Sequence, residues 1–279
     1  MIRVGTRGSA LALTQAAFVG ERLGAECELV RIEAAGPVDD KSRWVSGLER
    51  ALLDGSVDVA VHSAKDVPAE LADGLELVAI PEREDPRDAI CGARGLNDLA
   101  SGARVGTSSL RRAAQIRALR PDVEVLEVHG NVDTRLRKLA DGQYDALVLA
   151  VAGLVRLGRS EAIGGVLDEL VPAAGQGALA VEALTGSLLE PVLSGVRDAD
   201  ATACVMAERE LTRALGASCN TPVGAHATVL DGGDLSLTAW VGRPDGSAWV
   251  RDCVRGPAPG LGARIADRLL AAGAAELLS

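Results

Sequence analysis

The chain is poor in aromatic residues, with one Phe, one Tyr and three Trp among its 279 residues. Proteins that bind single-stranded nucleic acids usually stack the bases on aromatic side chains, and nucleic-acid-binding proteins generally carry positive charge. The net charge here is −10, so a nucleic-acid partner is not expected. The longest apolar run, residues 146–155, is about half the ~20 residues of a membrane-spanning helix. No apolar signal-peptide segment follows the N-terminus, which predicts a cytoplasmic protein without a membrane partner.

Metal-binding and disulfide patterns are also missing. The five cysteines include no C-x-x-C pair, and the three histidines lie far apart in the sequence. We therefore expect reduced thiols and no metal site. Hydrophobic residues make up 48% of the chain, which is typical of a soluble globular protein of two or three domains. No long apolar stripe is left over for self-association, so a monomer is the expected state.

Strand-like and helix-like patterns alternate over the first two thirds of the chain. The predicted strands are residues 2–4, 29–33, 57–61, 75–80, 123–128 and 145–151, and the predicted helices are 9–23, 45–53, 108–119 and 132–139. This alternation predicts α/β lobes of parallel or mixed sheet with flanking helices. The segments 81–87 and 172–177 resemble crossovers between two lobes that enclose a cleft. No internal repeat is apparent.

The pattern changes after about residue 199. An amphipathic helix is predicted over residues 202–215, followed by strands at 227–230, 235–241 and 248–254 and a closing helix at 261–278. Gly-rich and Asp-rich turns between the strands favour antiparallel hairpins. This indicates a small α+β domain with a three-stranded antiparallel sheet. The predicted boundaries are 1–81 with 178–196 for lobe 1, 87–171 for lobe 2 and 199–279 for the third domain.

Three predicted strand-to-helix junctions combine Gly, a capping side chain and Arg. They are Gly5-Thr-Arg-Gly-Ser9, Gly106-Thr-Ser-Ser-Leu-Arg-Arg112 and Gly130-Asn-Val-Asp-Thr-Arg135. A helix start presents unpaired N–H groups to an anion, and the guanidinium fork matches a carboxylate or phosphate. Each junction alone is equally an ordinary N-cap with a solvated Arg. Three of them in an acidic protein favour a shared polyanionic ligand, and none has the spacing of a nucleotide-binding loop.

Two further segments carry reactive groups. Lys65 and Asp66 follow the predicted strand 57–61, where open α/β sheets place their ligands, although an exposed charge pair is the simpler alternative. Cys219 lies in a polar loop, Gly216-Ala-Ser-Cys-Asn-Thr-Pro222, just beyond a predicted helix. Most lone cysteines are buried in the core, but these polar neighbours favour an accessible thiol.

Several long motifs occur together in order: VGTRGSALALTQ, VHSAKDVP, EREDPRDA, VGTSSLRR, GNVDTRLRKL, LAVAGLVRLG, PAAGQGALAVE and ERELTRALGASCNTPVGA. With these motifs the chain resembles the porphobilinogen deaminase (hydroxymethylbilane synthase) family over essentially its whole length. The resemblance implies two lobes like those of periplasmic binding proteins and a third domain with a cysteine loop. It also implies a reaction in which four porphobilinogen molecules are joined head to tail, with release of ammonia, to give linear hydroxymethylbilane.

The resemblance implies roles for individual residues. Asp66 matches the catalytic carboxylate, and Cys219 matches the residue that carries a dipyrromethane cofactor through a thioether. The other cofactor-binding positions match Ser63, Lys65, Thr107, Ser109, Arg111, Arg112 and Gly130. The positions that bind porphobilinogen and the growing polypyrrole chain match Arg7, Ser9, His129, Arg135, Arg156 and Gln176.

The chain departs from the family pattern at two places. His129 stands where the family usually has Arg, and a neutral imidazole cannot replace a bidentate guanidinium. The segment 34–44 is shorter than the family's loop, which acts as a lid. Two alternatives to the enzyme therefore stay open: a weakly active or non-catalytic relative that binds pyrrole carboxylates, and a plain bilobal anion-binding module.

Overall fold

The computed structural model describes residues 1–33, 43–218 and 221–278. The predicted lid segment therefore falls largely outside the described residues, as does Cys219. The chain divides into two compact units, Met1–Glu84 with Ala178–Val205 and Asp85–Gly177 with Met206–Ser279. Within the described ranges, no helix is both long and apolar enough to cross a bilayer.

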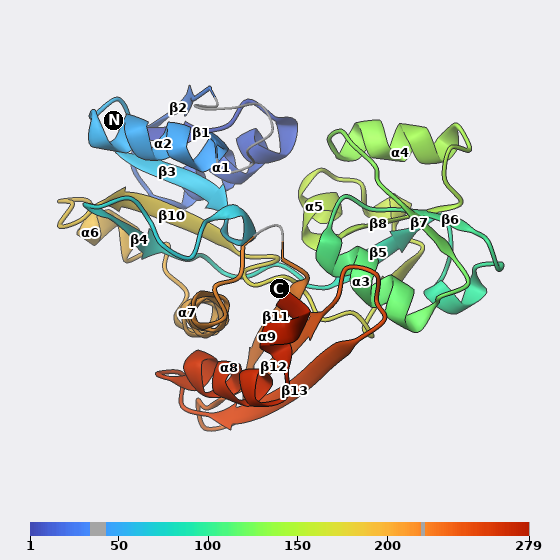
Figure 1. The fold of residues 1–279 in the computed structure, drawn as a ribbon. Helices are drawn as coiled ribbons and strands as arrows, with labels where there is room; N and C mark the ends of the chain where they lie inside the picture. Colours follow the sequence, from blue (N-terminus) through green and yellow to red (C-terminus); the bar gives the residue numbers. More distant parts are fainter. Residues whose placement is uncertain (34–42, 219–220, 279) are drawn as a thin grey trace. The chain divides into compact units, whose positions relative to one another are not determined.

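The first unit contains a five-stranded mixed sheet, which we call the first sheet (Figure 1). Its order is β2 (Cys27–Arg31), β1 (Ile2–Thr6), β3 (Val59–Ser63), β10 (Leu179–Leu184) and β4 (Leu75–Ala79). β1 runs parallel to β2 and β3, whereas β10 runs antiparallel to β3 and β4. Helices α1 (Ala10–Arg22) and α2 (Arg43–Leu53) contribute buried side chains to separate apolar clusters with this sheet, and the short α6 (Glu190–Leu193) follows β10.

The second unit contains a five-stranded mixed sheet of its own, the second sheet. Its order is β7 (Glu124–Leu126), β6 (Arg104–Gly106), β8 (Ala146–Ala150), β5 (Asp88–Cys91) and β9 (Gly165–Leu167). Helices α3 (Leu110–Leu119), α4 (Val132–Ala140) and α5 (Val151–Arg156) complete this part of the unit. β8 is buried almost throughout, as expected for a strand covered on both faces.

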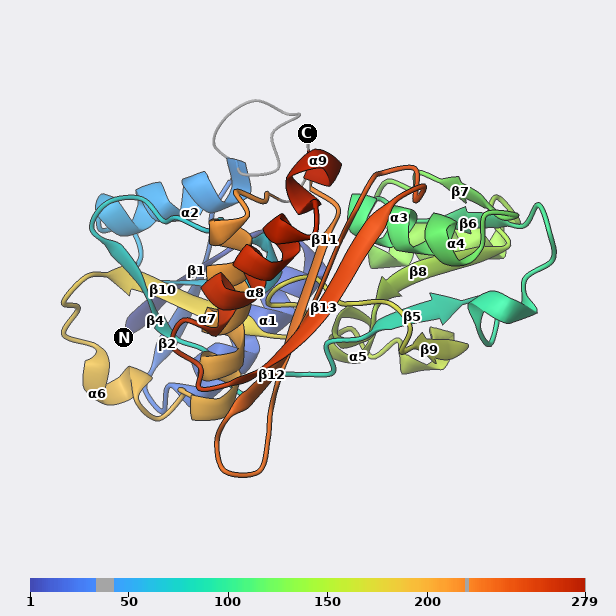
Figure 2. The same cartoon turned by 60° about the horizontal axis from the view of Figure 1, so that its bottom comes forward.

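A third sheet, antiparallel and three-stranded, lies near the C-terminus (Figure 2). It consists of β11 (Val223–Val229), β12 (Leu235–Gly242) and β13 (Trp249–Gly256). Helix α7 (Ala199–Ala214) precedes it, and α8 (Leu261–Ala271) packs against β12 and β13. α9 (Ala274–Leu278) is a separate helix because Gly273 adopts a φ of 95°, so the single helix predicted over residues 261–278 is wrong. The predicted α/β class, with two mixed sheets and a small antiparallel one, is confirmed.

The first and second sheets follow one plan, which corrects the expectation that the chain has no internal repeat. Their strand orders and directions correspond, with β1 matching β6, β3 matching β8 and β10 matching β5. The same Arg–Asp ion pair occurs near the start of both, between Arg3 and Asp58 and between Arg104 and Asp145. In each pair the backbone N–H of the arginine also donates to the carboxylate, at 2.7 Å. The repeat escapes the sequence because only short segments, such as Arg-Val-Gly-Thr, are shared.

Two helical glycines test how tightly these layers pack. We expect Gly20→Ala in α1 to stabilise the protein by about 0.5–1 kcal/mol, because the added Cβ would meet Cβ of Cys27 at an ordinary 3.6 Å. Gly262→Ala in α8 should instead destabilise it by about 1–3 kcal/mol, because its Cβ would collide with the backbone of α7, including N of Leu211 at 2.6 Å. Thermal unfolding of both variants measures the effects, and shifts of the same sign would contradict this packing.

Candidate functional site

Asp66 lies in a short 3-10 turn, Ala64–Asp66, directly after β3. The backbone N–H of Ala64 donates to the carbonyl oxygen of Ala178 at 3.0 Å, which joins the start of this turn to the segment that enters β10. Nη2 of Arg7, from the loop after β1, lies 3.4 Å from Oδ2 of Asp66. Both side chains are partly exposed, Arg7 at 31% and Asp66 at 40%. The first unit therefore brings together the acid and one of the predicted carboxylate-binding residues.

A small cavity of about 10 Å³ lies at this end of β3, lined by Arg7, Gln15, His62, Ser63 and Asp66 among others. That volume is close to the minimum for one water molecule and is far too small for a pyrrole ring. Nε2 of Gln15 donates to Oγ of Ser63 at 3.0 Å, so α1 holds the end of β3 through a buried side chain. Gln15 and His62 were not among the predicted site residues.

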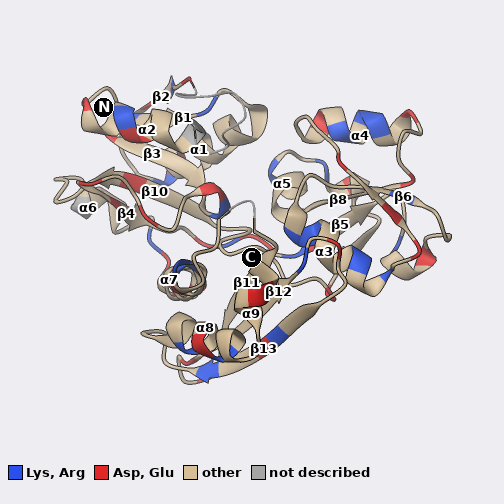
Figure 3. Ribbon diagram, viewed as in Figure 1, with Lys and Arg blue, Asp and Glu red and all other residues tan. Residues whose placement is uncertain are grey.

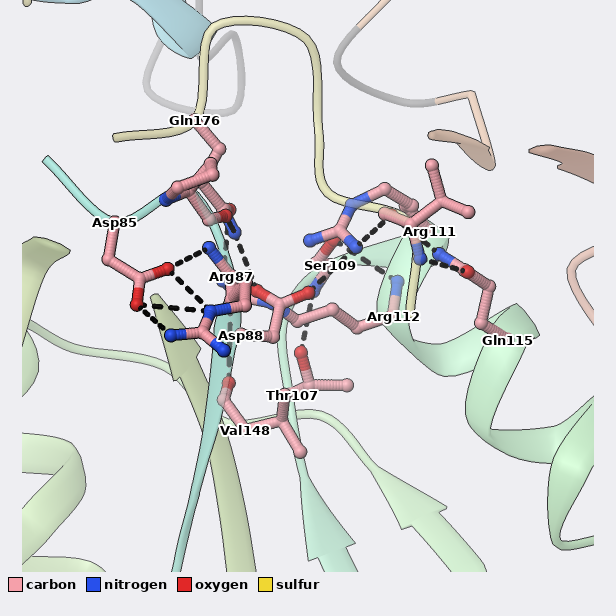
Figure 4. Close-up of polar contacts among 12 residues, drawn as sticks. Asp85, Arg87, Asp88, Thr107, Ser109, Arg111, Arg112, Gln115, Val148 and Gln176 are labelled. Atoms are coloured by element: carbon pink, nitrogen blue, oxygen red, sulfur yellow. Dashed lines mark hydrogen bonds and ion pairs between the residues drawn. The ribbon is translucent and has the colours of Figure 1, made fainter. Parts of the chain in front are cut away.

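In the second unit, the buried carboxylate of Asp88 accepts hydrogen bonds from two guanidinium groups (Figure 4). Nη1 of Arg111 donates to Oδ2 of Asp88 at 2.8 Å, and Nε of Arg112 donates to Oδ1 at 2.8 Å. Gln176 donates to the same Oδ1 at 2.8 Å. This network joins β5, the first turn of α3 and the segment before β10.

The network carries an excess of positive charge. Burial by itself raises the pKa of Asp88, but the charges of Arg111 and Arg112 outweigh it and hold the pKa well below its ordinary value. Burial lowers the pKa of Arg111 because it disfavours the charged form, and repulsion from Arg112 lowers it further, although the charge of Asp88 acts in the opposite direction. Nε of Arg111 is buried, and the described residues offer it no hydrogen-bond partner. Two cations also stand in the first turn of α3, where the helix dipole favours anions. The local charge of this cluster is therefore suited to binding an anion.

The predicted helix starts are N-caps in the structure. Oγ of Ser9 accepts from N of Ala12, Oγ of Ser109 from N of Arg112, and Oδ1 of Asn131 from N of Thr134. Thr107 is buried, and its Oγ1 accepts from N of Ser109 at 3.2 Å. The first turn of α3 carries Arg111 and Arg112, whereas the first turn of α4 carries Asp133. The basic residues of α4 (Arg135, Arg137 and Lys138) lie further along the helix, and the blue segments in Figure 3 mark the basic residues of both helices.

The other predicted substrate-binding residues differ in exposure. Nε of Arg135 donates to the carbonyl oxygen of Gly130 at 2.7 Å, and burial, followed by repulsion from Arg112, lowers the pKa of Arg135. Arg156 donates to the carbonyl oxygen of Gly177 at 2.7 Å. The side chain of His129 is 76% exposed. The ligand roles of these residues, and of Arg111 and Arg112, stay predictions.

Comparisons with known proteins identify the family. The family model described as "Porphobilinogen deaminase, dipyromethane cofactor binding domain" matches residues 2–188. A second model, described as "Porphobilinogen deaminase, C-terminal domain", matches residues 202–271. The chain belongs to the porphobilinogen deaminase family. A porphobilinogen deaminase of Thiobacillus denitrificans is 44% identical over 99% of this chain and 97% of its own length. One of Deinococcus deserti is 43% identical over the same shares.

Solved structures with a related backbone include an extracytoplasmic solute receptor of Bordetella pertussis that binds pyroglutamic acid. It is 15% identical, covers 76% of this chain and 81% of its own, and has a TM-score of 0.42. The family predicted from the motifs is confirmed by the two family models and by the porphobilinogen deaminases of similar sequence.

Asp88→Asn should lower the free energy of unfolding by about 3–5 kcal/mol at neutral pH, because it leaves two buried guanidinium groups without their counter-charge. The folded pKa of Asp88 is depressed, so the wild-type contribution is present above the ordinary pKa of about 3.9 and is lost as the pH falls toward the folded value. Urea unfolding from neutral pH to about pH 3 should therefore show the two proteins converging.

Asp85→Asn is the matched control, since the Asp85 pair with Arg87 at 2.6 Å is partly exposed and should contribute less than about 1 kcal/mol. A wild-type advantage over Asp88→Asn that stayed constant down to pH 3 would contradict the ionised, buried carboxylate.

Proposed function

We propose that this chain is a hydroxymethylbilane synthase: it joins four porphobilinogen molecules head to tail, with release of four ammonia molecules. The observation that carries this proposal is the match of both family domains along the chain, together with an acid at the carboxyl end of β3 where the motif VHSAKDVP predicts it. We further propose that it acts as a cytoplasmic monomer.

The residues of the second unit fit a polycarboxylate cofactor. Each pyrrole of a dipyrromethane carries an acetate and a propionate, and the excess positive charge around Asp88 and the orphaned Nε of Arg111 call for anions. We propose that Thr107, Ser109, Arg111, Arg112 and Gly130 hold the cofactor, with Ser63 and Lys65 of the first unit. When bound, the cofactor supplies the pyrrole carbon to which the first substrate is joined. Arg7, Ser9, His129, Arg135, Arg156 and Gln176 are proposed to bind the acetates and propionates of the substrate and the growing chain.

Asp66 is proposed as the catalytic group. When ammonia leaves porphobilinogen, the C–N bond breaks and positive charge develops on the pyrrole. A carboxylate that accepts a hydrogen bond from the pyrrole N–H stabilises that charge. It can also take up a proton released during the condensation. Arg7, with Nη2 at 3.4 Å from Oδ2 of Asp66, supplies a nearby positive charge that favours the ionised carboxylate.

Asp66→Asn should reduce kcat for porphobilinogen consumption by about 10²–10⁴-fold, because the amide cannot take up a proton or balance the developing charge. The thermal unfolding midpoint should stay close to the wild-type value, because the side chain is 40% exposed. Asp73→Asn, at an exposed carboxylate in the same unit, serves as the control and should retain full activity. A near-normal kcat in Asp66→Asn would remove this role from Asp66.

Cys219 is proposed to hold the dipyrromethane through a thioether, so Cys219→Ser should lack the adduct of two pyrrole units in its intact mass. Cys253→Ser should keep the adduct, which controls for the loss of an exposed thiol. An adduct retained in Cys219→Ser would place the attachment elsewhere. Mass and turnover together also separate the alternatives: an adduct without turnover indicates a non-catalytic relative, and the absence of both indicates a simple anion-binding module.

A further inference from the structure

A buried polar pair in the first sheet has no part in the mechanism described so far. Nε2 of His62, on β3, lies 2.9 Å from Oε2 of Glu182, on β10. The two side chains are 3% and 0% exposed. Oε1 of Glu182 is also buried and has no hydrogen-bond partner among the described residues. A carboxylate that uses only part of its hydrogen-bonding capacity in the interior is a costly way to fill space.

The second sheet shows that the fold does not require this pair. Glu182 lies opposite Ala60 on β3, and the matching position of β5 is Cys91, which lies opposite Leu147 on β8. His62, two residues beyond Ala60, corresponds in the same way to Leu149. Both counterparts are buried and apolar. The same architecture therefore forms with apolar residues at both positions.

The pair of His62 and Glu182 lies at the end of β3, directly before the turn that carries Asp66. The end of β3 is held on one face by His62 and Glu182, and through the neighbouring Ser63 by Gln15 of α1. His62 and Ser63 are successive residues of β3, so their side chains point to opposite faces of the sheet. The turn that carries Asp66 begins at the next residue, Ala64. His62 also lines the small cavity that Asp66 lines.

The end of β8, which matches the end of β3, is not followed by an acid. By the same register, Lys65 and Asp66 correspond to Ala152 and Gly153 in α5, so no acid has to be positioned there. The hydrogen-bonded pair thus accompanies the acid in one sheet and is replaced by apolar residues in the sheet that lacks it.

We propose that His62 and Glu182 are positioning residues for Asp66. Their hydrogen bond fixes the last residues of β3 and so sets the place of the carboxylate that follows. This inference rests on the proposed function, because the role of Asp66 belongs to it. A displacement of about 1 Å at a reacting group can lower the rate about 10²-fold. Loss of the His62–Glu182 hydrogen bond could therefore lower kcat by up to about that factor.

The decisive variant is His62→Leu with Glu182→Leu, which gives the first sheet the apolar character of the second. Because both partners are removed together, no buried charge is left unpaired, and the thermal midpoint should stay within about 4 °C of wild type. We expect the adduct mass to be retained and kcat to fall about 10–100-fold, with KM for porphobilinogen changed by less than about threefold. A folded double variant with wild-type kcat would overturn the proposal.

Glu182→Gln supplies the conservative counterpart. Its amide oxygen can still accept the hydrogen bond from His62, so this variant should retain at least about half of the wild-type kcat if the hydrogen bond does the positioning. A loss as large as that of the double variant would overturn the proposal. This variant also keeps the test decisive should the double variant fail to fold.

The controls separate this inference from the proposed function. Leu149→Met with Cys91→Ala changes the matching positions of the second sheet without adding volume and should leave kcat unchanged. Wild type and Asp66→Asn are assayed alongside. If the wild type does not consume porphobilinogen, the proposed function fails and this inference fails with it. If the wild type turns over, Asp66→Asn is strongly impaired and the double variant keeps the wild-type kcat, only the positioning role is wrong.

Discussion

The second unit depends on one shared carboxylate. Asp88 is fully buried and receives hydrogen bonds from Arg111, Arg112 and Gln176, which come from segments far apart in the sequence. Buried guanidinium groups cannot be left without a counter-charge, so Asp88 is what allows two of them to stand at the start of α3. One negative charge against two positive ones leaves the site cationic inside a protein whose net charge is −10. Local placement of charge, rather than overall composition, therefore decides which ligands this protein can hold.

The two mixed sheets act as controls for each other. Where the second sheet has Asp88, Arg111 and Arg112, the corresponding residues of the first unit are the apolar Leu179, Leu11 and Ala12. Where the first sheet has His62 and Glu182, the second has Leu149 and Cys91. Since both sheets share strand order and the initial Arg–Asp pair, the polar differences are not requirements of folding. They occur at the positions for which we propose a functional role in each sheet.

Local patterns were sufficient to predict much of the fold. The alternation of apolar runs located β1, β3 and β8, and the capping residues located the starts of α1, α3 and α4. Strands β5, β6, β9 and β10 were missed. β6 and β9 have only three residues each, and β5 and β10 directly follow segments rich in proline or glycine that resemble linkers. Both missed central strands run antiparallel to their neighbours, a direction that βα alternation does not predict.

The site was predictable where it follows from short motifs and not where it depends on long-range pairing. Asp66 and the three helix starts are local features, and the structure places them as expected. The partners of Arg111 and Arg112 are not local: Asp88 and Gln176 are brought to them only by the fold. A signal was nonetheless present, since Asp88 begins an otherwise apolar strand and Glu182 interrupts another. An acidic residue inside a buried strand needs a hydrogen-bond or ion-pair partner, so it directs attention to the polar residues that the fold brings beside it.

The different burial of the acid and the cations fits the roles proposed for them. A guanidinium keeps its charge throughout a reaction cycle, so Arg111 and Arg112 can be buried and fixed by Asp88. A carboxylate that takes up a proton in each of four condensations must release it before the next one. Asp66 is 40% exposed, which allows exchange with water, and its ion pair with Arg7 is long at 3.4 Å. An acid held so loosely by its own side chain must be placed by the backbone that carries it, which is why buried hydrogen bonds gather at the end of β3.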